Sequence, residues 1–308
     1  MVVIVTGSSG HLGTAVCDLL LAHGHSVIGV DVRIRHDAPH PFLAADLGDP
    51  MAIHRALDMV PDGADAVVHL ANHITSTGKP AGQILRENLS MNTSVFMAAY
   101  ERGVGHVVFS SSIQAMLGGS EIDGSWSQRL PLRLPLDESI PCAPTNVYGL
   151  SKVLSEQMLD HLTNAERFGA ASHRSGPESA HMSAVTIRFP FIVSDERLDD
   201  ARTTARSIGG EKGVAEAFTY ITRSDAADAV CRAVEATVTG HEILWCSAPD
   251  PRTEEGADHS IDRFYVDVPG AQQCRQTGSL VDCSKAHAVI GWRAVHTLHP
   301  HSEREDVR

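Results

Sequence analysis

A short apolar run that leads directly into a glycine-rich turn constrains the fold of this chain more than any other feature. Val2–Val5 has the continuous apolarity of a strand that is buried on both faces. The segment TGSSGHLG (residues 6–13) follows with glycines spaced as GxxGxxG, and a helical pattern of apolar residues comes next. In this order, Gly7 is expected to permit a tight turn, Gly10 to admit a pyrophosphate to backbone N–H groups, and Gly13 to allow close helix–strand packing.

Strands and helices continue to alternate through the first half of the chain. Strands are expected at Val27–Val30, Phe42–Ala45, Ala66–Leu70, His106–Phe109 and Ala184–Arg188, and helices at Leu12–Leu21, Ile84–Arg102 and Val147–Leu162. This alternation predicts an α/β fold, a Rossmann doubly wound parallel sheet with a smaller C-terminal substrate-binding lobe. Residues 1–188, joined again by 220–247, are expected to form the NAD-binding Rossmann domain, and residues 189–219 with 248–308 the smaller lobe.

Composition and charge exclude several classes of protein. The 308 residues are 43% hydrophobic and 20% charged, as in an ordinary globular protein. A formal net charge of −13 argues against non-specific binding to nucleic acid, and no stretch approaches the roughly 20 apolar residues of a membrane helix. The six cysteines form no CxxC pair, the 18 histidines show no HExxH spacing, and the first residues carry no basic signal-peptide region. These features predict a cytoplasmic protein with a small-molecule substrate, without a metal, nucleic acid or membrane partner.

An acidic residue ends the second predicted strand. Asp31 directly follows Val27–Val30, where a carboxylate accepts hydrogen bonds from the adenosine ribose hydroxyls and repels a 2′-phosphate. The sequence therefore favours NAD over NADP as the cofactor. Arg33 keeps NADP open, because a nearby arginine can accommodate that phosphate.

A tyrosine and a lysine lie four residues apart on one face of a predicted helix. The Lys152 ammonium is expected to lower the pKa of the Tyr148 phenol from about 10 toward neutrality. An oxidised nicotinamide adds a second positive charge, so that the phenol can exchange a proton with a substrate hydroxyl. The serine run 110–112 follows the fifth predicted strand, at the sheet edge where ligands bind.

Together these segments resemble the extended short-chain dehydrogenase/reductase family, in its NAD-dependent epimerase/dehydratase group. The resemblance covers nearly the whole chain. It rests on TGSSGHLG, Asp31, Asp46-Leu47, His69-Leu70-Ala71, Asn88, VVFSSS, Tyr148 with Lys152, Ile187-Arg188-Phe189-Pro190, Tyr220-Ile221 with Asp225, and the stretch Asp282–Trp292.

The resemblance implies a role for each matching residue. The implied cofactor contacts are Gly7, Gly10, His11, Leu12, Asp31, Asp46, Leu47, Leu70, Ala71, Asn88, Ser110, Tyr148, Lys152 and Phe189. The implied catalytic residues are Ser112, which orients the substrate hydroxyl, Tyr148 as the acid/base, and Lys152, which binds the nicotinamide ribose. Ser111 is the alternative to Ser112, because the glycine usual after the serine run comes one position late, at Gly118.

Substrate contacts and a partner are implied in the same way. Expected substrate contacts are His73, Thr75, Ser76, Ser112, Gln114, Asn146 and Tyr148. Members of the family commonly pair the long helix with the tyrosine helix, so a homodimer through a four-helix contact of Ile84–Arg102 and Val147–Leu162 is expected.

The segment after the sixth strand departs from that of nucleotide-sugar epimerases. It is short, because only Phe191–Thr219 separates Pro190 from Tyr220, and Phe218 stands where those enzymes carry a diphosphate-binding arginine. A buried diphosphate needs cationic or amide partners. Basic residues of the short segment that could substitute are Arg197, Arg202, Arg206 and Lys212. The simpler inference is a smaller substrate with one negative charge or none, as in the uronate dehydrogenases of this family.

Four functions follow from these observations. The first is an NAD-dependent dehydrogenase of a free sugar or sugar acid, and the second is a nucleotide-sugar epimerase of the 4-epimerase type with tightly held NAD. A dehydratase is disfavoured, because Ile113-Gln114 stands where those enzymes carry an Asp-Glu pair. A non-catalytic NAD-binding regulator would be expected to lose Tyr148 or Lys152, and both are present.

Overall fold

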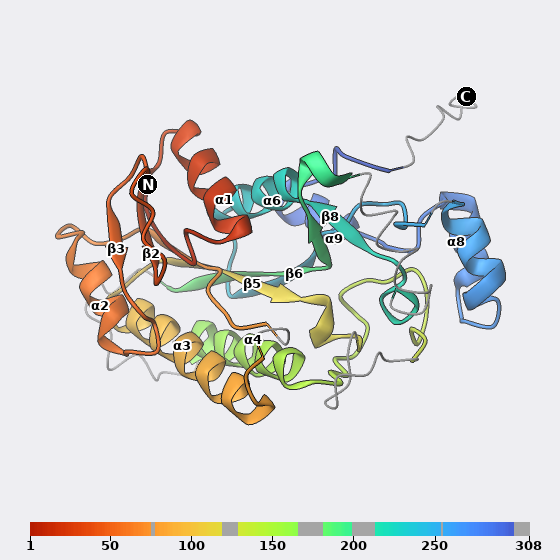
Figure 1. The fold of residues 1–308 in the computed structure, drawn as a ribbon, viewed down its shortest axis with the longest axis horizontal. Helices are drawn as coiled ribbons and strands as arrows, with labels where there is room; N and C mark the ends of the chain where they lie inside the picture. Colours follow the sequence, from red (N-terminus) through yellow and green to blue (C-terminus); the bar gives the residue numbers. More distant parts are fainter. Residues whose placement is uncertain (75–77, 119–128, 166–180, 199–212, 254, 299–308) are drawn as a thin grey trace.

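The computed structural model describes residues 1–74, 78–118, 129–165, 181–198, 213–253 and 255–298. Within these ranges a seven-stranded sheet in the order β3-β2-β1-β4-β5-β6-β9 forms the centre of the molecule (Figure 1), and every neighbouring pair is parallel. Its strands are β1 Val2–Thr6, β2 Ser26–Asp31, β3 Phe42–Ala44, β4 Ala66–His69, β5 His106–Ser112, β6 Ser183–Phe189 and β9 His241–Trp245. The predicted α/β doubly wound fold is therefore confirmed.

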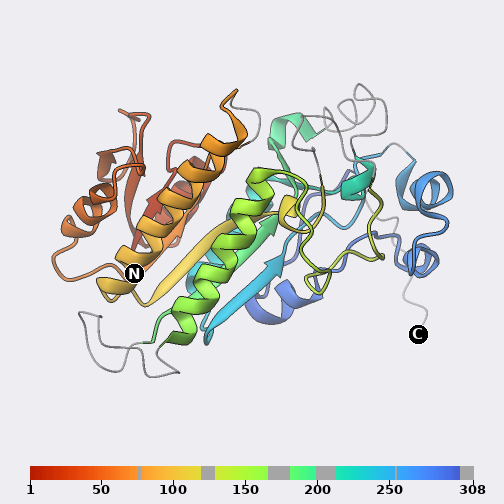
Figure 2. The ribbon, with the colours of Figure 1, turned by 90° about the horizontal axis from the view of Figure 1, so that it is seen from below.

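Helices cover both faces of this sheet. They are α1 His11–Ala22 and α6 Arg223–Glu235 on one face, and α2 Met51–Asp58, α3 Ala81–Glu101 and α4 Val147–Ala165 on the other (Figures 1 and 2). Successive residues of β1 point to opposite layers, since Val3 packs under α1 and α6 whereas Ile4 packs against α2 and α3. Both layers are apolar, which explains why β1 is continuously hydrophobic instead of alternating.

A smaller group of elements follows β6. It contains the parallel pair β7 Phe191–Val193 and β8 Tyr220–Thr222, and the helices α7 Gly256–Ser260, α8 Ala271–Thr277 and α9 Ser284–Ile290. Short 3-10 turns are η2 Ile113–Ala115, η4 Asp195–Arg197 and η5 Val214–Glu216, and η6 Ile261–Tyr265 is a π-helical turn. A separate apolar cluster around Phe218, Trp245 and Tyr265 joins η5, η6, α7 and α8, whereas α9 packs into the apolar layer of α1 and α6.

The late sequence motifs tie the C-terminal segment to α6. The Asp225 carboxylate, which is 4% exposed, accepts hydrogen bonds from the backbone N–H groups of Val295 (3.1 Å) and His296 (2.9 Å). The indole of Trp292 donates to the backbone oxygen of Asp225 at 3.0 Å. Asp225 and the IGW stretch therefore hold the C-terminal segment against α6.

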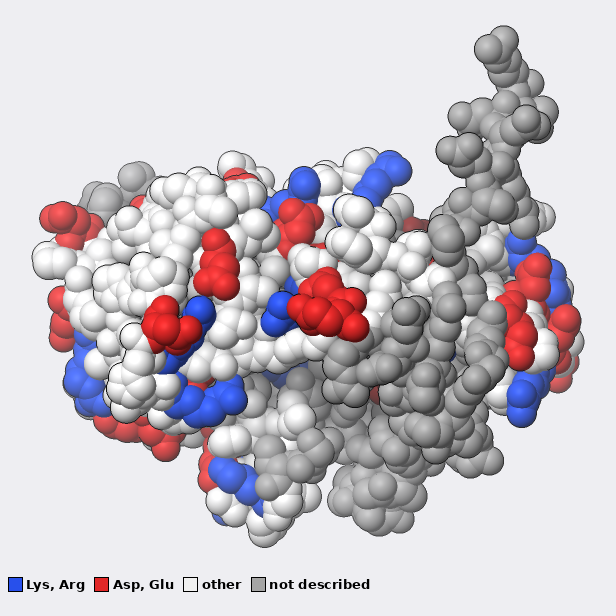
Figure 3. Space-filling model, turned by 45° about the horizontal axis from the view of Figure 1, so that its top comes forward, with Lys and Arg blue, Asp and Glu red and all other residues white. Residues whose placement is uncertain are grey.

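The charged side chains are not gathered into one patch on the face shown in Figure 3. There, acidic and basic side chains lie in small groups, often next to each other, with uncharged surface between them. Among the described residues, the helices are too short or too polar to cross a lipid bilayer.

Candidate active site

The glycine turn between β1 and α1 brings backbone groups unusually close together. Gly7 has a φ of +71°, donates its N–H to the Val30 oxygen at 2.8 Å, and lies so near β4 that an added Cβ would be 2.8 Å from the Ala71 nitrogen. A Cβ at Gly13 would lie 2.0 Å from the Gly7 oxygen. Only glycine fits both positions, and Gly7 and Gly10 of this turn line the pocket described next.

A pocket of about 240 Å³ opens beside this turn, at the carboxyl ends of β1, β2 and β4. Such a crevice, where the strand order reverses, is the usual ligand position of open α/β sheets. The predicted residues that line it are Gly7, Gly10, Asp31, Asp46, Leu47, Leu70, Ala71 and His73. The pocket is also lined by Val30, Val32, Ala45, Asn72 and Met91, which were not predicted as site residues. Arg33, considered above as a contact for NADP, lines it too.

Backbone amides fix the Asp31 carboxylate at the edge of the pocket. One oxygen accepts the N–H of Ser9 at 3.0 Å and the other accepts the N–H of Arg33 at 2.9 Å. Each carboxylate oxygen can accept a further hydrogen bond. The carboxylate is therefore held in a fixed orientation and can still accept hydrogen bonds, as a ribose-binding group requires.

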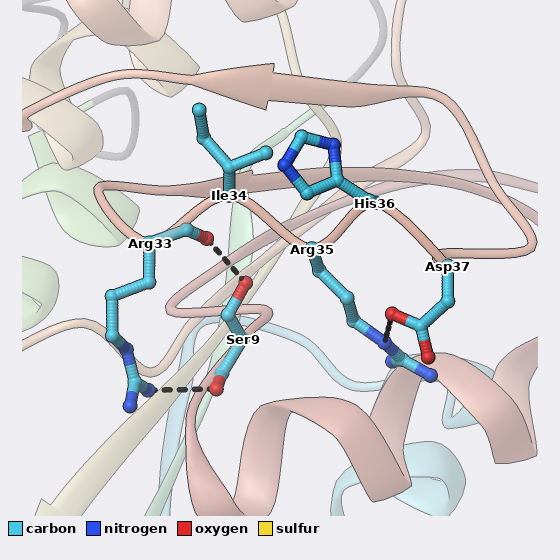
Figure 4. A pocket seen from close by; sticks show the side chains of 6 residues that line it. All are labelled: Ser9, Arg33, Ile34, Arg35, His36 and Asp37. Carbon is cyan, nitrogen blue, oxygen red and sulfur yellow. Dashed lines mark hydrogen bonds and ion pairs between the residues drawn. The ribbon is translucent and has the colours of Figure 1, made fainter.

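A second, open pocket of about 550 Å³ borders the same turn (Figure 4). The Arg33 guanidinium folds back onto the Ser9 backbone oxygen at 2.7 Å, and the Arg35 guanidinium lies 3.4 Å from Asp37. Arg33 Nε also lies 3.9 Å from Asp31. Both arginines therefore contact oxygens of the protein itself.

The serine run forms the end of β5 and distributes its side chains to different partners. Ser111 donates to the Glu156 carboxylate at 2.6 Å, within the buried ion pair of Glu156 with Arg188 (2.7 Å). Ser112 hydrogen-bonds with the Tyr148 side chain and accepts the Gln114 N–H at 3.2 Å. The structure thus brings Ser112, and not Ser111, to the tyrosine.

Lys152 is buried beside the tyrosine. Its Nζ donates to the Ser110 backbone oxygen at 2.6 Å, and lies 4.6 Å from the ring centre of Phe109 and 5.3 Å from that of Tyr148. Burial lowers the pKa of Lys152 to about 7, although the Glu156 carboxylate acts in the opposite direction.

The pKa of the tyrosine corrects the sequence expectation. Burial raises the pKa of Tyr148 to about 12, and the hydrogen bond with Ser112 only partly opposes it. The predicted lowering of this pKa is wrong for the chain without cofactor, because burial removes the water that would stabilise the ionised phenol.

The remaining predicted contacts lie around the pocket rather than in it. Asn88 is fully buried and brackets the backbone of His73, accepting its N–H and donating to its oxygen, both at 2.8 Å. Asn146 donates to the Gln114 side chain at 2.9 Å and caps α4 by accepting the Gly149 N–H at 2.9 Å. These amides hold loops and a helix end in place.

The other predicted residues are distributed as follows. His11 is exposed at the start of α1, whereas Leu12 and Phe189 are buried in the apolar layer under α1 and α6. Thr75, Ser76, Arg202, Arg206, Lys212 and the side chain of Arg197 lie outside the described residues.

A buried polar network behind the site was missed in the sequence. His69 bonds to Thr6 (2.6 Å) and to Asn92 (2.8 Å), and Asn92 donates to Ser155 (2.7 Å). Burial lowers the pKa of His69 to about 3, so that the imidazole is neutral. The available signal was the spacing of Asn88 and Asn92 on one helix, and of their partners on the next.

Comparison with known proteins gives the family. The pattern described as "NAD dependent epimerase/dehydratase family" matches residues 3–243. UDP-glucose 4-epimerase of Azospirillum brasilense is 31% identical over 165 residues, which are 51% of this chain and 43% of the epimerase. Uronate dehydrogenase of Pseudomonas syringae pv. tomato is 26% identical over 198 residues, which are 62% of this chain and 66% of that enzyme. The aligned part of the chain thus spans less than two thirds of either relative.

Solved structures share the fold. A short-chain dehydrogenase/reductase superfamily protein from Agrobacterium tumefaciens, crystallised with bound NAD, superposes with a TM-score of 0.66 at 19% identity, covering 96% of this chain and 93% of that one. Uronate dehydrogenase from the same organism gives 0.62 at 19% identity, covering 96% and 84%. The description of the matching family as NAD dependent agrees with the predicted NAD cofactor. The chain belongs to the NAD-dependent epimerase/dehydratase family.

Proposed function

We propose that this chain is an NAD-dependent oxidoreductase acting on a sugar hydroxyl, as a dehydrogenase of a free sugar or sugar acid. The observation that carries the proposal is the contact of Tyr148 with Ser112, with Lys152 buried alongside and anchored to the Ser110 oxygen. A phenol and a hydroxyl in hydrogen-bond contact can together bind a substrate hydroxyl and exchange its proton.

The residues of the first pocket fit NAD. Gly7 and Gly10 line this pocket without side chains that would keep a pyrophosphate away, and the Asp31 carboxylate is held ready for a ribose. When bound, oxidised NAD supplies the hydride acceptor and a positive charge that favours the ionised phenol.

The residues of the proposed site then have distinct roles. Ser112 donates a hydrogen bond that orients the substrate hydroxyl, and Tyr148 takes the proton from it. Lys152, fixed by Ser110, binds the nicotinamide ribose and stabilises the ionised phenol. Asp31 selects NAD by repelling a 2′-phosphate.

A buried arginine supports an anionic substrate. Arg252 is 6% exposed, its guanidinium lies 5.1 Å from the Phe191 ring centre, and its Nε has no hydrogen-bond partner among the described residues. Phe191 lies two residues after Phe189, which pairs with Ser112 in the sheet. The buried Glu216 carboxylate is a charged neighbour of Arg252, and the unpaired Nε leaves a donor that a single carboxylate on the substrate could use.

The test is turnover with a panel of free uronic acids, aldoses and nucleotide sugars, scored by NADH absorbance. We expect net NADH with at least one uronic acid or aldose, none with Tyr148→Phe, and a higher KM for uronic acids but not aldoses in Arg252→Leu. Net NADH with no member of the free-sugar set would contradict the dehydrogenase.

The second candidate is an epimerase of a nucleotide sugar, favoured by the 31% identity to UDP-glucose 4-epimerase. It would convert its substrate to the epimer without accumulating NADH. Chromatography of the products from the same panel distinguishes this reaction from dehydrogenation. A buried, apolar Phe218 in place of a cation argues for the first candidate.

A further inference from the structure

Metal-binding side chains converge at the end of α1 that is remote from the glycine turn. His23 directly follows α1, and Cys231 and Glu235 lie one helical turn apart on α6. The two helices lie side by side over the sheet (Figure 1). An imidazole, a thiol and a carboxylate thus meet although His23 is more than 200 positions from the other two residues in the chain.

The donor atoms are spaced as a single small cation requires. His23 Nδ1 lies 2.9 Å from Glu235 Oε1 and 3.4 Å from Cys231 Sγ, and Sγ lies 3.9 Å from Oε1. Zinc bonds of about 2.0–2.3 Å in tetrahedral geometry put neighbouring ligand atoms roughly 3.3–3.7 Å apart. The three observed separations therefore need to change by only a few tenths of an ångström.

We propose that this cluster is a zinc site, in which His23 Nδ1, the Cys231 thiolate and the Glu235 carboxylate bind one Zn²⁺ and water takes the fourth position. His25 completes the arrangement, because its Nε2 lies 3.0 Å from Glu235 Oε1 and its side chain is only 10% exposed. A hydrogen bond from a buried imidazole is the usual support for a carboxylate ligand.

Charge and ligand type both favour zinc. Thiolate and imidazole suit zinc, whereas magnesium and calcium prefer oxygen ligands. One thiolate and one carboxylate neutralise the two charges of the ion, and the imidazole binds uncharged. Because cysteine binds zinc as a thiolate, zinc binding releases one thiol proton to solvent.

The site would act on the fold and not on the chemistry. Twelve residues of α1, about 18 Å of helix, separate it from the glycine turn that faces the cofactor. Zinc would join the α1–β2 turn to α6 across the chain, and should stabilise the folded state by binding it alone.

The test uses the whole chain without a polyhistidine tag, stripped with EDTA and then titrated with Zn²⁺ or Co²⁺. We expect one equivalent of metal, a rise in the thermal midpoint that EDTA reverses, and the thiolate-to-cobalt absorption and visible bands of four-coordinate Co²⁺. His23→Gln should weaken binding at least ~10-fold, and Cys231→Ser should remove the thiolate-to-cobalt band.

Cys274→Ser is the matched control, since Cys274 is another buried helix cysteine, whose thiol donates to Gly270 at 3.7 Å. It should keep both the metal and the cobalt spectrum. His23 is 39% exposed, so its variant remains informative if Cys231→Ser folds poorly. Equal zinc affinity in the parent and His23→Gln, or a cobalt complex of the parent without the thiolate band, would overturn the proposal. Because every readout is independent of turnover, failure of the proposed reaction would leave this result unaffected.

Discussion

Burial acts on the two central side chains of the candidate active site in opposite directions. It raises the pKa of Tyr148 to about 12 and lowers that of Lys152 to about 7. In the chain without cofactor, Tyr148 is therefore uncharged near pH 7, whereas Lys152 is about half protonated. The spacing of the two residues was readable from the sequence, but their loss of water depends on how α4 packs on β5 and could not be read there.

Ser112 and Ser111 provide a sharp comparison at the residue scale. Ser112→Ala should reduce kcat by about 100-fold or more, because it removes the hydroxyl that meets Tyr148. Ser111→Ala should leave kcat near that of the parent, and should lower the free energy of unfolding by ~1–3 kcal/mol, because the buried Glu156 loses a donor. Steady-state kinetics and urea unfolding measure the two effects. The reverse order of kcat losses would assign the role to Ser111.

Asp31 should control the choice of dinucleotide. Asp31→Asn removes the negative charge while keeping an oxygen for the amides of Ser9 or Arg33, so the preference for NAD over NADP in kcat/KM should fall at least ~10-fold, equivalent to ~1.4 kcal/mol. Arg33→Ala is the companion variant, because this exposed side chain should matter for NADP alone. An unchanged ratio in Asp31→Asn would show that the carboxylate does not select.

Among the elements, α3 and α4 are joined by a buried polar ladder and not by apolar contacts alone. Asn88 donates to Ser151 at 3.3 Å and Asn92 to Ser155 at 2.7 Å, so two positions one turn apart on α3 match two on α4. His69 of β4 extends the ladder to Thr6 of β1. Figure 2 shows the two helices lying along each other across the sheet.

Because of His69, this ladder should make the free energy of unfolding decrease at acidic pH. The folded-state pKa of His69 is lowered to about 3 from 6.5, so below pH 6.5 the unfolded chain binds the proton and the folded chain does not. Stability from this group is complete above pH 6.5 and is lost as the pH falls toward 3. Between pH 6.5 and 5 the parent should lose about 1.6 kcal/mol more than His69→Gln.

Urea unfolding of both proteins at the two pH values measures this difference. Other histidines contribute equally to the parent and the variant, so they cancel in the comparison. Parallel losses of stability in the two proteins would show that His69 is protonated in the folded state.

Local patterns predicted the elements whose signals are local. The strands β1 to β6 and the helices α1, α3 and α4 lie where the sequence placed them, with shifts such as the start of α3 at Ala81 instead of Ile84. No strand was placed at β9 and no helix at α6. The helix α2 was missed, since Met51–Asp58 offers only two turns. The α3–α4 ladder and the cluster at His23 could not be predicted, because both depend on which helix faces which in the assembled sheet.

The whole molecule leaves apolar side chains on the outer side of α3 and α4. Leu85 and Leu89 on α3 and Leu154 on α4 are half-buried, and Leu150 is 36% exposed. The family resemblance implies that a second copy covers this surface in a homodimer, which stays a prediction.

A charge on this surface should dissociate the expected homodimer. Leu89→Glu combined with Leu154→Glu would bury carboxylates at the four-helix contact, which is costly without partners. Light scattering after size-exclusion chromatography should show a dimer for the parent and a monomer for the double variant. Val266→Glu, at a 56% exposed position elsewhere, should remain a dimer. A monomeric parent would refute the homodimer.

The strand order determines when each strand can pair while the polypeptide is being synthesised. β1 lies between β2 and β4, so the first strand gains its second neighbour only when residues 66–69 have been made. The glycine turn and its acidic companion can therefore assemble early, from the first quarter of the chain. β6 waits for residues 241–245 before its outer edge is paired. During synthesis, the glycine turn and Asp31 can thus be in place well before β9 pairs with β6. Until then, the unpaired edge of β6 is where a nascent chain of this protein needs shielding from its neighbours.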